Sequence, residues 1–263
     1  MPRALWTAAS GMTAQQFNVD LLANNIANVN TTGFKRQRTD FQDLFYDIKT
    51  QPGARAGAQG RNPIGNQVGT GVTVSGTTRI FTAGNMEPTG RTLDIGIEGD
   101  GFFEVQLPNG ATTAYTRAGD FHVDNDGRLV TADGYYVQPS ITIPDGVAEN
   151  DISIAGDGTV TYVKDSVEST VGQITLARFR NNSGLLATGR NLFEASEASG
   201  PAITGTPTDS GFGTLRGGML EKANVESVTE LVNLIVAQRA YELNSKSISV
   251  ADQMLTTANN LIR

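Results

Sequence analysis

The chain has 263 residues and a formal net charge of −7; 38% of its residues are hydrophobic and 18% are charged. This composition is sufficient for one or two domains with real cores, and its acidic balance argues against nucleic-acid binding, which needs a basic stripe to neutralise phosphates. Because the sequence has no cysteine, disulfides, thiolate catalysis and cysteine-ligated metal sites are excluded.

Residues 1–30 are predicted to form an amphipathic helix. Uncharged positions recur alternately three and four residues apart, as in a heptad seam: Leu5, Ala8, Met12, Gln15, Val19, Leu22, Ile26 and Val29. Within residues 4–30 the only charge is Asp20, whereas the outer face of a helix in water usually carries Glu and Lys. We therefore expect this helix to be surrounded by other protein on most sides.

The same N-terminal stretch lacks the continuous apolar core of a signal peptide. No apolar run in the sequence approaches the ~18 residues that a membrane-spanning helix needs. We expect either a cytoplasmic protein or one exported by a route without a cleaved signal.

Asparagine is a poor helix former, yet four asparagines crowd the end of this helix: Asn24, Asn25, Asn28 and Asn30. We expect Asn30 and Gly33 to stop the helix, because both tolerate the left-handed conformation that follows helices. The other amides are interpreted as groups that bond to neighbouring copies, since a polar group in a packed seam fixes register.

A segment without periodicity follows, Tyr46–Gly69, which is rich in Gly, Pro, Gln and Arg. A free loop of this length is uncommon inside a compact domain. We expect it to be either disordered or ordered by a partner.

From about Gly71 to Gly213 the sequence consists of short alternating runs between Gly, Asp and Asn residues, which predicts an antiparallel all-β domain of sandwich or irregular-barrel type. Four dipeptides are typical of hairpin turns at strand spacing: Asn109-Gly110, Asp126-Gly127, Asp133-Gly134 and Asp157-Gly158.

From about Asn224 to the end no Gly or Pro occurs, and a second long helix is predicted. One row of residues recurs every seven positions: Leu234, Tyr241, Ile248, Leu255 and Ile262. A second row lies on an adjacent stripe: Val236, Ala240, Leu243, Ser247, Val250, Met254 and Leu261. Two adjacent rows make a face wide enough to contact several helices at once. The fold class predicted is therefore α+β, with long terminal helices forming a coiled-coil-like domain around an inserted all-β domain.

No pattern for catalysis, a cofactor or a metal is found. The glycines of "GIEGDGFF" fit neither a dinucleotide loop nor a Walker loop. "DNDG" fails the register of a calcium loop, because His122 would take the first ligand position. His122 is the only histidine, so a transition-metal site is not expected. An enzyme is not predicted.

The two terminal motifs resemble those of the bacterial flagellar rod and hook axial proteins. "LLANNIANVNTTGFKRQR" matches an N-N-x-A-N-x-x-T-x-G-F-K signature through Asn24, Asn25, Ala27, Asn28, Thr31, Gly33, Phe34 and Lys35. "NVESVTELVNLIVAQRAYELNSKSISVADQML" resembles the closing motif of the same family through Asn224, Val225, Glu230, Leu231, Gln238, Arg239, Ala240, Tyr241, Asn244, Lys246, Asp252, Met254 and Leu255.

The length and the segment Tyr46–Gly69 are most similar to those of distal-rod members of this family. The resemblance implies a structural subunit without cofactor that polymerises into a hollow, rigid drive shaft and forms part of the export channel. It implies partners of four kinds: other copies of the chain, proximal-rod and hook proteins at the ends, ring bushing proteins around the shaft, and the flagellar export apparatus. It also implies a place in the basal body, across the periplasm. The alternatives are a hook or proximal-rod protein and, in another class, a secreted glycan-binding β domain.

The expected organisation follows from this resemblance. Residues 1–31 and 224–263 would form the helical polymerisation domain, residues 32–70 and 214–223 a linking region, and residues 71–213 an outer β domain. The residues expected to carry assembly are Leu5, Met12, Val19, Leu22, Asn24, Asn25, Ile26, Asn28, Val29, Gly33, Phe34, Leu231, Leu234, Gln238, Arg239, Tyr241, Leu243, Asn244, Ile248, Met254 and Leu255. Within the extended segment 46–69, the residues expected to stiffen the polymer are Tyr46, Pro52, Gly53, Pro63, Gly65 and Gly69.

Overall fold

The computed structural model describes residues 3–53, 55–56, 60–61, 63–107, 112–144, 146–164 and 167–261. The chain divides into two compact units. We call the first the helix–hairpin unit (Met1–Ile26, Gln37–Thr78, Glu226–Arg263) and the second the β unit (Ala27–Arg36, Arg79–Val225). The chain therefore passes between the two units four times. The predicted α+β class is confirmed; a coiled-coil geometry of the helices stays a prediction.

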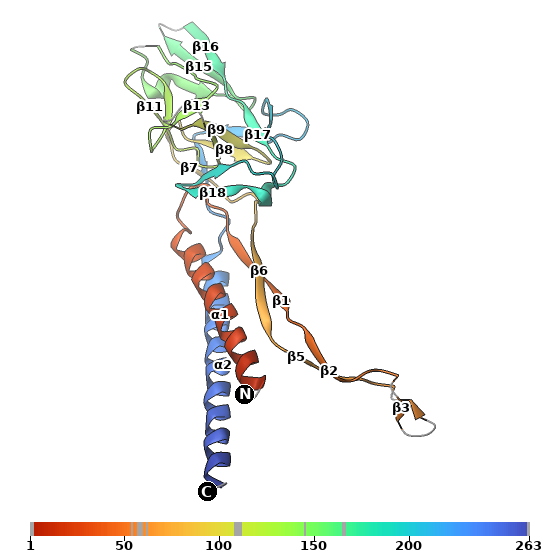
Figure 1. Cartoon of the computed structure of the whole chain (residues 1–263). Coiled ribbons are helices and arrows are strands. Elements are labelled where there is room, and N and C mark those ends of the chain that lie inside the picture. Colours follow the sequence, from red (N-terminus) through yellow and green to blue (C-terminus); the bar gives the residue numbers. More distant parts are fainter. Residues whose placement is uncertain are drawn as a thin grey trace. The chain divides into compact units, whose positions relative to one another are not determined.

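Both predicted terminal helices are present (Figure 1): α1 (Arg3–Ala27) and α2 (Ser227–Leu261). Helix α1 ends in a turn in which the Thr31 backbone N–H donates to the Asn28 carbonyl oxygen at 3.1 Å and the Thr31 hydroxyl donates to Asn28 Oδ1 at 3.2 Å. Gly33 then adopts the left-handed conformation, with φ of 67°. Asn30 is not among the residues of positive φ, so the prediction that it stops the helix through that conformation is wrong.

The segment expected to lack structure of its own forms paired strands in the described residues, as Figure 1 shows. Strand β1 (Gln37–Asp43) pairs with β6 (Val72–Arg79). Further along the same hairpin β2 (Tyr46–Thr50) pairs antiparallel with β5 (Asn66–Gly69), and β3 (Arg55–Ala56) with β4 (Gly60–Arg61). The alternation of apolar residues in these strands is too short to be recognised as periodic.

The β unit is built around one antiparallel nine-stranded sheet. Its strand order is β11-β12-β13-β9-β10-β19-β18, and β17 joins β9 to β20. The strands of this sheet are β9 (Phe102–Gln106), β10 (Thr113–Thr116), β11 (Phe121–Val123), β12 (Leu129–Thr131), β13 (Tyr136–Gln138), β17 (Leu176–Arg178), β18 (Leu186–Gly189), β19 (Leu192–Glu194) and β20 (Ile203–Gly205).

Smaller sheets complete the β unit. Strands β14 (Ile152–Ile154), β15 (Thr159–Lys164) and β16 (Val167–Gln173) form a three-stranded sheet. Strand β21 (Thr214–Gly217) pairs with β8 (Ile95–Glu98), and β22 (Met219–Glu221) pairs with β7 (Met86–Pro88). Two 3-10 turns, η1 (Glu149–Asp151) and η2 (Asn182–Gly184), lie between strands.

Hydrophobic residues alternate between the two faces of the central sheet. Phe103 and Val105 of β9 belong to the main core, in which the rings of Phe103 and Phe121 meet edge to face at 5.0 Å. Phe102 of the same strand belongs to a second cluster on the opposite face, together with Tyr115 and Phe179. This period of two is what a β-strand buried on both faces requires.

The turn predictions are confirmed at three of four positions. Gly127, Gly134 and Gly158 all have positive φ and lie between paired strands. The fourth dipeptide, Asn109-Gly110, lies outside the described residues.

The predicted boundaries differ from the structure in two places. Residues 72–79 were expected in the β domain, but they form β6, whose partner β1 lies in the helix–hairpin unit. Residues 214–221 were expected to link the parts, but β21 and β22 are paired strands of the β unit. Pairing between strands far apart in sequence leaves no local signal, which explains both differences.

Candidate assembly surface

The first half of helix α1 buries only small residues. Ala8, Gly11 and Ala14 are buried, and a Cβ atom added to Gly11 would lie 2.8 Å from the Asn244 Nδ2 atom of α2. Glycine at this position therefore allows the two helices to approach closely. Of the predicted assembly residues on α1, Leu22 is buried, whereas Leu5, Met12, Val19 and Ile26 are half-buried.

Helix α2 buries only a narrow stripe. Its buried residues are Glu230, Ala237 and Ala251, and half-buried residues on the same stripe are Leu234, Asn244 and Ile248. Most of the second predicted row is exposed: Leu243 is 66% exposed, and Val236, Val250 and Met254 are also exposed, whereas Ala240 is half-buried. Further exposed hydrophobic residues of α2 are Val228, Leu231, Val232, Ile235, Tyr241 and Leu255. We call the exposed hydrophobic residues of α2 together with Trp6 and Phe17 of α1 the helix assembly surface.

The β unit exposes far fewer large hydrophobic side chains than the two helices do. Among its described residues, the exposed large hydrophobic side chains are Val163, Val167, Leu186 and Ile203. Contiguous apolar patches are rare on monomeric soluble proteins, and large ones mark interaction sites. The helix assembly surface is therefore a stronger candidate for an interaction site than the surface of the β unit.

Several exposed polar side chains of α2 have no partner among the described residues. Arg239, Glu242 and Lys246 have the spacing of helix-surface ion pairs, but no ion pair among them is found in the part of the chain that the structure describes. These charges are thus open to groups outside the chain. Gln238, also exposed, makes no hydrogen bond within the same described residues.

Asn25 connects three elements inside the helix–hairpin unit. Its side chain is fully buried, its Nδ2 donates to the Gln37 carbonyl oxygen at 2.9 Å, and the Gln37 N–H donates to its Oδ1 at 3.0 Å. The same Nδ2 donates to the Glu230 carboxylate at 3.5 Å. The amide thus joins the end of α1 to the start of β1 and to the first turn of α2. The interpretation that Asn25 bonds to a neighbouring copy is corrected accordingly, while that for Asn24 and Asn28 stays a prediction.

A buried ionic cluster lies in the β unit, formed by Lys35, Arg117 and Glu221, all nearly inaccessible to solvent. Lys35 Nζ lies 2.6 Å from Glu221 Oε1 and also donates to the Thr82 carbonyl oxygen at 2.8 Å. Arg117 Nη1 lies 3.4 Å from Glu221 Oε2, and its Nη2 donates to the Gly99 carbonyl oxygen at 2.7 Å. Burial lowers the pKa of Lys35 and of Arg117, while the charge of Glu221 opposes this lowering in both.

Gly33 and Phe34 hold the N-terminal segment against this cluster. The Gly33 N–H donates to the Glu221 carbonyl oxygen at 2.8 Å, and an added Cβ atom would lie 2.6 Å from the Arg117 carbonyl carbon. No other residue fits there, both for space and for its positive φ. Phe34 is buried against Ala223 and Val225, with Val29 half-buried beside them.

The hairpin exposes several large hydrophobic residues. Phe45 is 89% exposed, and Phe41, Tyr46, Ile48, Ile64 and Val68 are also exposed. A hydrogen bond and the charge of Asp43 raise the pKa of the Tyr46 phenol. Gly65 is held tightly, since a Cβ atom there would lie 2.6 Å from Pro52 Cδ. Gly53 has positive φ and open space, and Gly69 lies opposite Tyr46 in the strand pairing. Pro63 is exposed.

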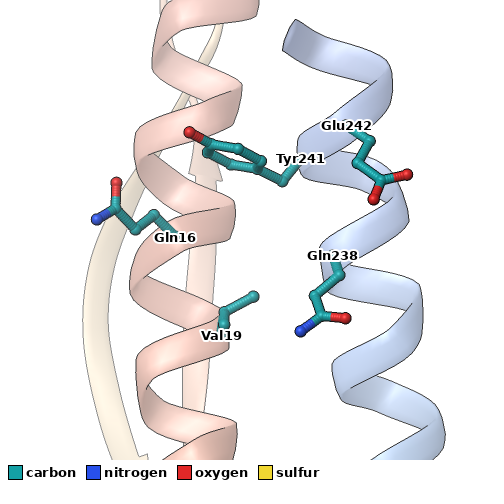
Figure 2. Close-up of a pocket in the computed structure, with 5 residues that line it drawn as sticks. All are labelled: Gln16, Val19, Gln238, Tyr241 and Glu242. Carbon is teal, nitrogen blue, oxygen red and sulfur yellow. The ribbon is translucent and has the colours of Figure 1, made fainter.

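A groove lies between the two helices, with a volume of about 430 Å³. We call it the helix groove; its lining residues are Gln16, Val19, Gln238, Tyr241 and Glu242. Figure 2 shows the Tyr241 ring reaching from α2 toward α1, with Val19 pointing from α1 toward α2. Neither the Gln16 nor the Glu242 side chain makes a hydrogen bond in the described part of the chain.

Sequence reasoning missed the roles of Arg117, Glu221 and Asn25. Each has at least one side-chain partner 104 or more residues away along the chain. The one available signal, for Arg117 and Glu221, was the presence of isolated charged residues in a sequence in which only 18% of the residues are charged. No group of His, Asp or Glu that could hold a metal ion is found among the described residues. Over the same residues, neither helix is long and apolar enough to cross a membrane.

Three protein-family models match the chain. The flagella basal body rod protein model matches residues 5–35, the flagellar hook protein FlgE/F/G D1 domain model residues 96–162, and the flagellar basal body rod FlgEFG protein C-terminal model residues 216–261. The first contains most of α1, the last contains all of α2, and the middle one lies in the β unit.

Individual relatives extend this similarity over the whole chain. The flagellar basal-body rod protein FlgG of Borreliella burgdorferi is 50% identical over 265 residues, which covers 100% of both chains. The FlgG of Caulobacter vibrioides is 48% identical over 260 residues, covering 98% of this chain and 99% of the relative. The flagellar hook protein FlgE of Helicobacter mustelae is 45% identical over 141 residues, but these cover only 52% of this chain and 30% of the hook protein.

Proposed function

The chain belongs to the family of flagellar hook and basal-body rod proteins, and we propose that it is a structural subunit of the distal rod that polymerises into a hollow, rigid drive shaft. The end-to-end similarity to rod proteins, against about half of the chain for the hook protein, favours the rod over the hook. The relatives are structural proteins of the basal body, and no enzymatic family is indicated.

The helix assembly surface carries this proposal. Leu243 and Met254 are exposed in the single chain. Burying each of these side chains against a neighbour would stabilise the assembly by about 1.5–3 kcal/mol. Several such residues on one helix favour contact with more than one neighbour. A subunit that meets its copies through different surfaces forms an open helical polymer when the rotation between successive copies does not close into a ring.

The proposal includes the partners that the terminal motifs imply. Proximal-rod and hook proteins would bind the two ends of the polymer, ring bushing proteins would surround it in the periplasm, and the flagellar type III apparatus would export the subunit. The sparse exposed hydrophobic residues of the β unit suit a surface that turns inside a bushing without strong fixed contacts. Tight stoichiometric binding of the polymer to a ring protein would contradict this last point.

Polymerisation of the purified chain, followed by electron microscopy, tests the proposal. We expect straight hollow filaments from the unaltered chain and none from Leu243→Glu, because a carboxylate would enter a packed seam without a partner. Ser245→Glu is the matched control: it adds the same charge at an exposed position of α2 outside both apolar rows. The proposal fails if the unaltered chain stays monomeric under all assembly conditions, or if Leu243→Glu polymerises as well as the control.

A further inference from the structure

We propose that Trp6 of one copy inserts its indole ring into the helix groove of a second copy. This inference rests on the proposed polymerisation and names one contact within it. The helix groove and Trp6 both belong to the helix–hairpin unit, and neither is occupied or covered by the chain's own described residues.

Trp6 is the side chain that most needs a partner on α1. It is 67% exposed and is the only tryptophan of the chain. Aromatic side chains supply a large share of interface energy, and the indole N–H takes a hydrogen-bond partner when it is buried. The binding site for this residue must therefore combine an apolar wall with an acceptor.

The helix groove has this combination. Val19 and the Tyr241 ring supply apolar walls, and the Gln238 side chain reaches from α2 toward α1 (Figure 2) with an amide that makes no hydrogen bond within the described residues. The donor-only indole N–H complements the amide oxygen of Gln238. An aliphatic side chain would instead remove this amide from water without pairing it, which is unfavourable.

The groove is also of suitable size. Its volume of about 430 Å³ lies near the lower end of the range, about 300–1,000 Å³, of pockets that hold small ligands. It therefore accepts a large side chain rather than a whole helix.

The occupant must come from a second copy. Trp6 and Gln16 lie on the same helix ten residues apart, a separation of about 15 Å at 1.5 Å per residue, which no side chain spans. Because the groove opens between the helices that carry the helix assembly surface, the contact continues that surface. Between parallel copies, insertion of Trp6 beside Gln16 or Val19 sets an axial offset of about 15–20 Å.

Phe17 is the rival occupant, since it is also an exposed aromatic residue of α1. Its ring has no N–H donor, so it would leave the amide oxygen of Gln238 unpaired. Trp6 is therefore the better match to this lining, and the experiment below separates the two.

Tryptophan fluorescence of the full chain reports on Trp6 alone, because the chain has no other tryptophan. On polymerisation we expect the emission to shift to shorter wavelength and quenching by acrylamide to fall several-fold. Gln238→Arg should fill the groove and either leave Trp6 open to quenching or reduce polymer yield. Ser245→Arg, which places the same side chain outside the groove, should behave as the unaltered chain. Protection of Trp6 in well-formed Gln238→Arg polymers would overturn the proposal.

Cross-linking between copies gives an independent test, and the absence of native cysteine makes it clean. Chains carrying Trp6→Cys are copolymerised with chains carrying Gln238→Cys and treated with a short bismaleimide. We expect mixed dimers, and few when Lys246→Cys replaces Gln238→Cys. Both positions of the expected pair are exposed in the single chain, so folding should be retained.

The outcomes separate this inference from the proposed function. Polymers in which Trp6 stays exposed, or in which Phe17→Cys rather than Trp6→Cys links to Gln238→Cys, overturn the inference and leave the rod proposal standing. Failure of the unaltered chain to polymerise counts against the proposed function itself.

Discussion

Glu221 is the residue on which most of the buried charge in the β unit depends. Its two carboxylate oxygens lie beside Lys35 and Arg117, and its Oε1 also accepts a hydrogen bond from the Gly84 N–H at 2.8 Å. A buried ion pair contributes little net stability in itself, but removing one partner leaves an uncompensated charge in a poorly solvated place. Here one carboxylate serves two cations, so its loss is especially unfavourable.

Glu221→Gln should therefore lower the free energy of unfolding by about 3–5 kcal/mol, the usual effect of breaking a buried ion pair. Urea unfolding of the monomer, followed by circular dichroism, measures the change. Glu98→Gln is the matched control, because the Glu98–Arg216 pair at 2.8 Å is exposed on both sides; it should alter stability by less than about 1 kcal/mol. Equal effects of the two variants would show that the buried cluster has no special role.

The lowered pKa of Lys35 predicts that the free energy of unfolding depends on pH. Burial holds this pKa below its ordinary value of 10.5, so between the two values the unfolded chain binds more protons than the folded chain. Stability contributed by this residue therefore rises with pH in that window. Comparing the unaltered chain with Lys35→Met across pH values from neutral to 10.5 should show this rise only in the unaltered chain. Parallel curves would contradict the assignment.

Loss of the neutral Asn25 side chain should also leave buried polar groups without partners. Asn25→Ala removes the bonds to Gln37 and leaves Glu230, itself buried, without one of its donors. The expected loss is about 1–3 kcal/mol, the effect of leaving buried polar groups unsatisfied. Asn24→Ala, at an exposed neighbour on the same helix, should have a smaller effect in thermal unfolding. A larger effect of Asn24→Ala would refute this account of the buried hydrogen bonds of Asn25.

At the scale of elements, the hairpin is the part whose role can be removed cleanly. The Thr70 N–H donates to the Phe45 carbonyl oxygen at 3.1 Å, so the residues that flank Tyr46–Gly69 already lie together. Deleting 46–69 and joining its flanks through a short glycine turn should preserve β1 and β6. We expect polymers that are more bendable, as in a hook, because the exposed hydrophobic residues of the hairpin can no longer lie along neighbouring subunits. Cryo-electron microscopy of filament curvature measures this, and filaments as straight as those of the unaltered chain would contradict it.

The elements also show how far the sequence alone reaches. Both helices and three hairpin turns were predictable, because heptad spacing and Asp-Gly dipeptides are local signals. The ionic cluster was not, since Lys35 and Glu221 are 186 residues apart. The hairpin was missed because its strands are short and exposed, and the internal role of Asn25 because nothing near it in sequence identifies Glu230 as its partner. The assembly surface was anticipated from the second apolar row, whose Leu243 and Met254 remain exposed.

At the scale of the whole molecule, the two units should differ in stability before assembly. The β unit has a continuous core, whereas the helices share few buried residues and expose many, and isolated helices are marginal in water. In a dilute monomer we expect fast amide hydrogen exchange in residues 3–27 and slow exchange in β9 and β10. In the polymer both should be protected. Equal protection of α1 in monomer and polymer, measured by mass spectrometry, would show that the helices are already stable alone.

The four passages of the chain between the units have a mechanical consequence. A single linker would act as a swivel, since rotation about its bonds relieves twist. Four parallel connections wind around one another when one unit rotates against the other. They therefore share an applied load and resist this rotation. Three of the four lie within ten residues of a buried polar anchor, namely Asn25, Lys35 or Glu221. A twist applied to the helices would thus reach the β unit through the backbone of these four connections.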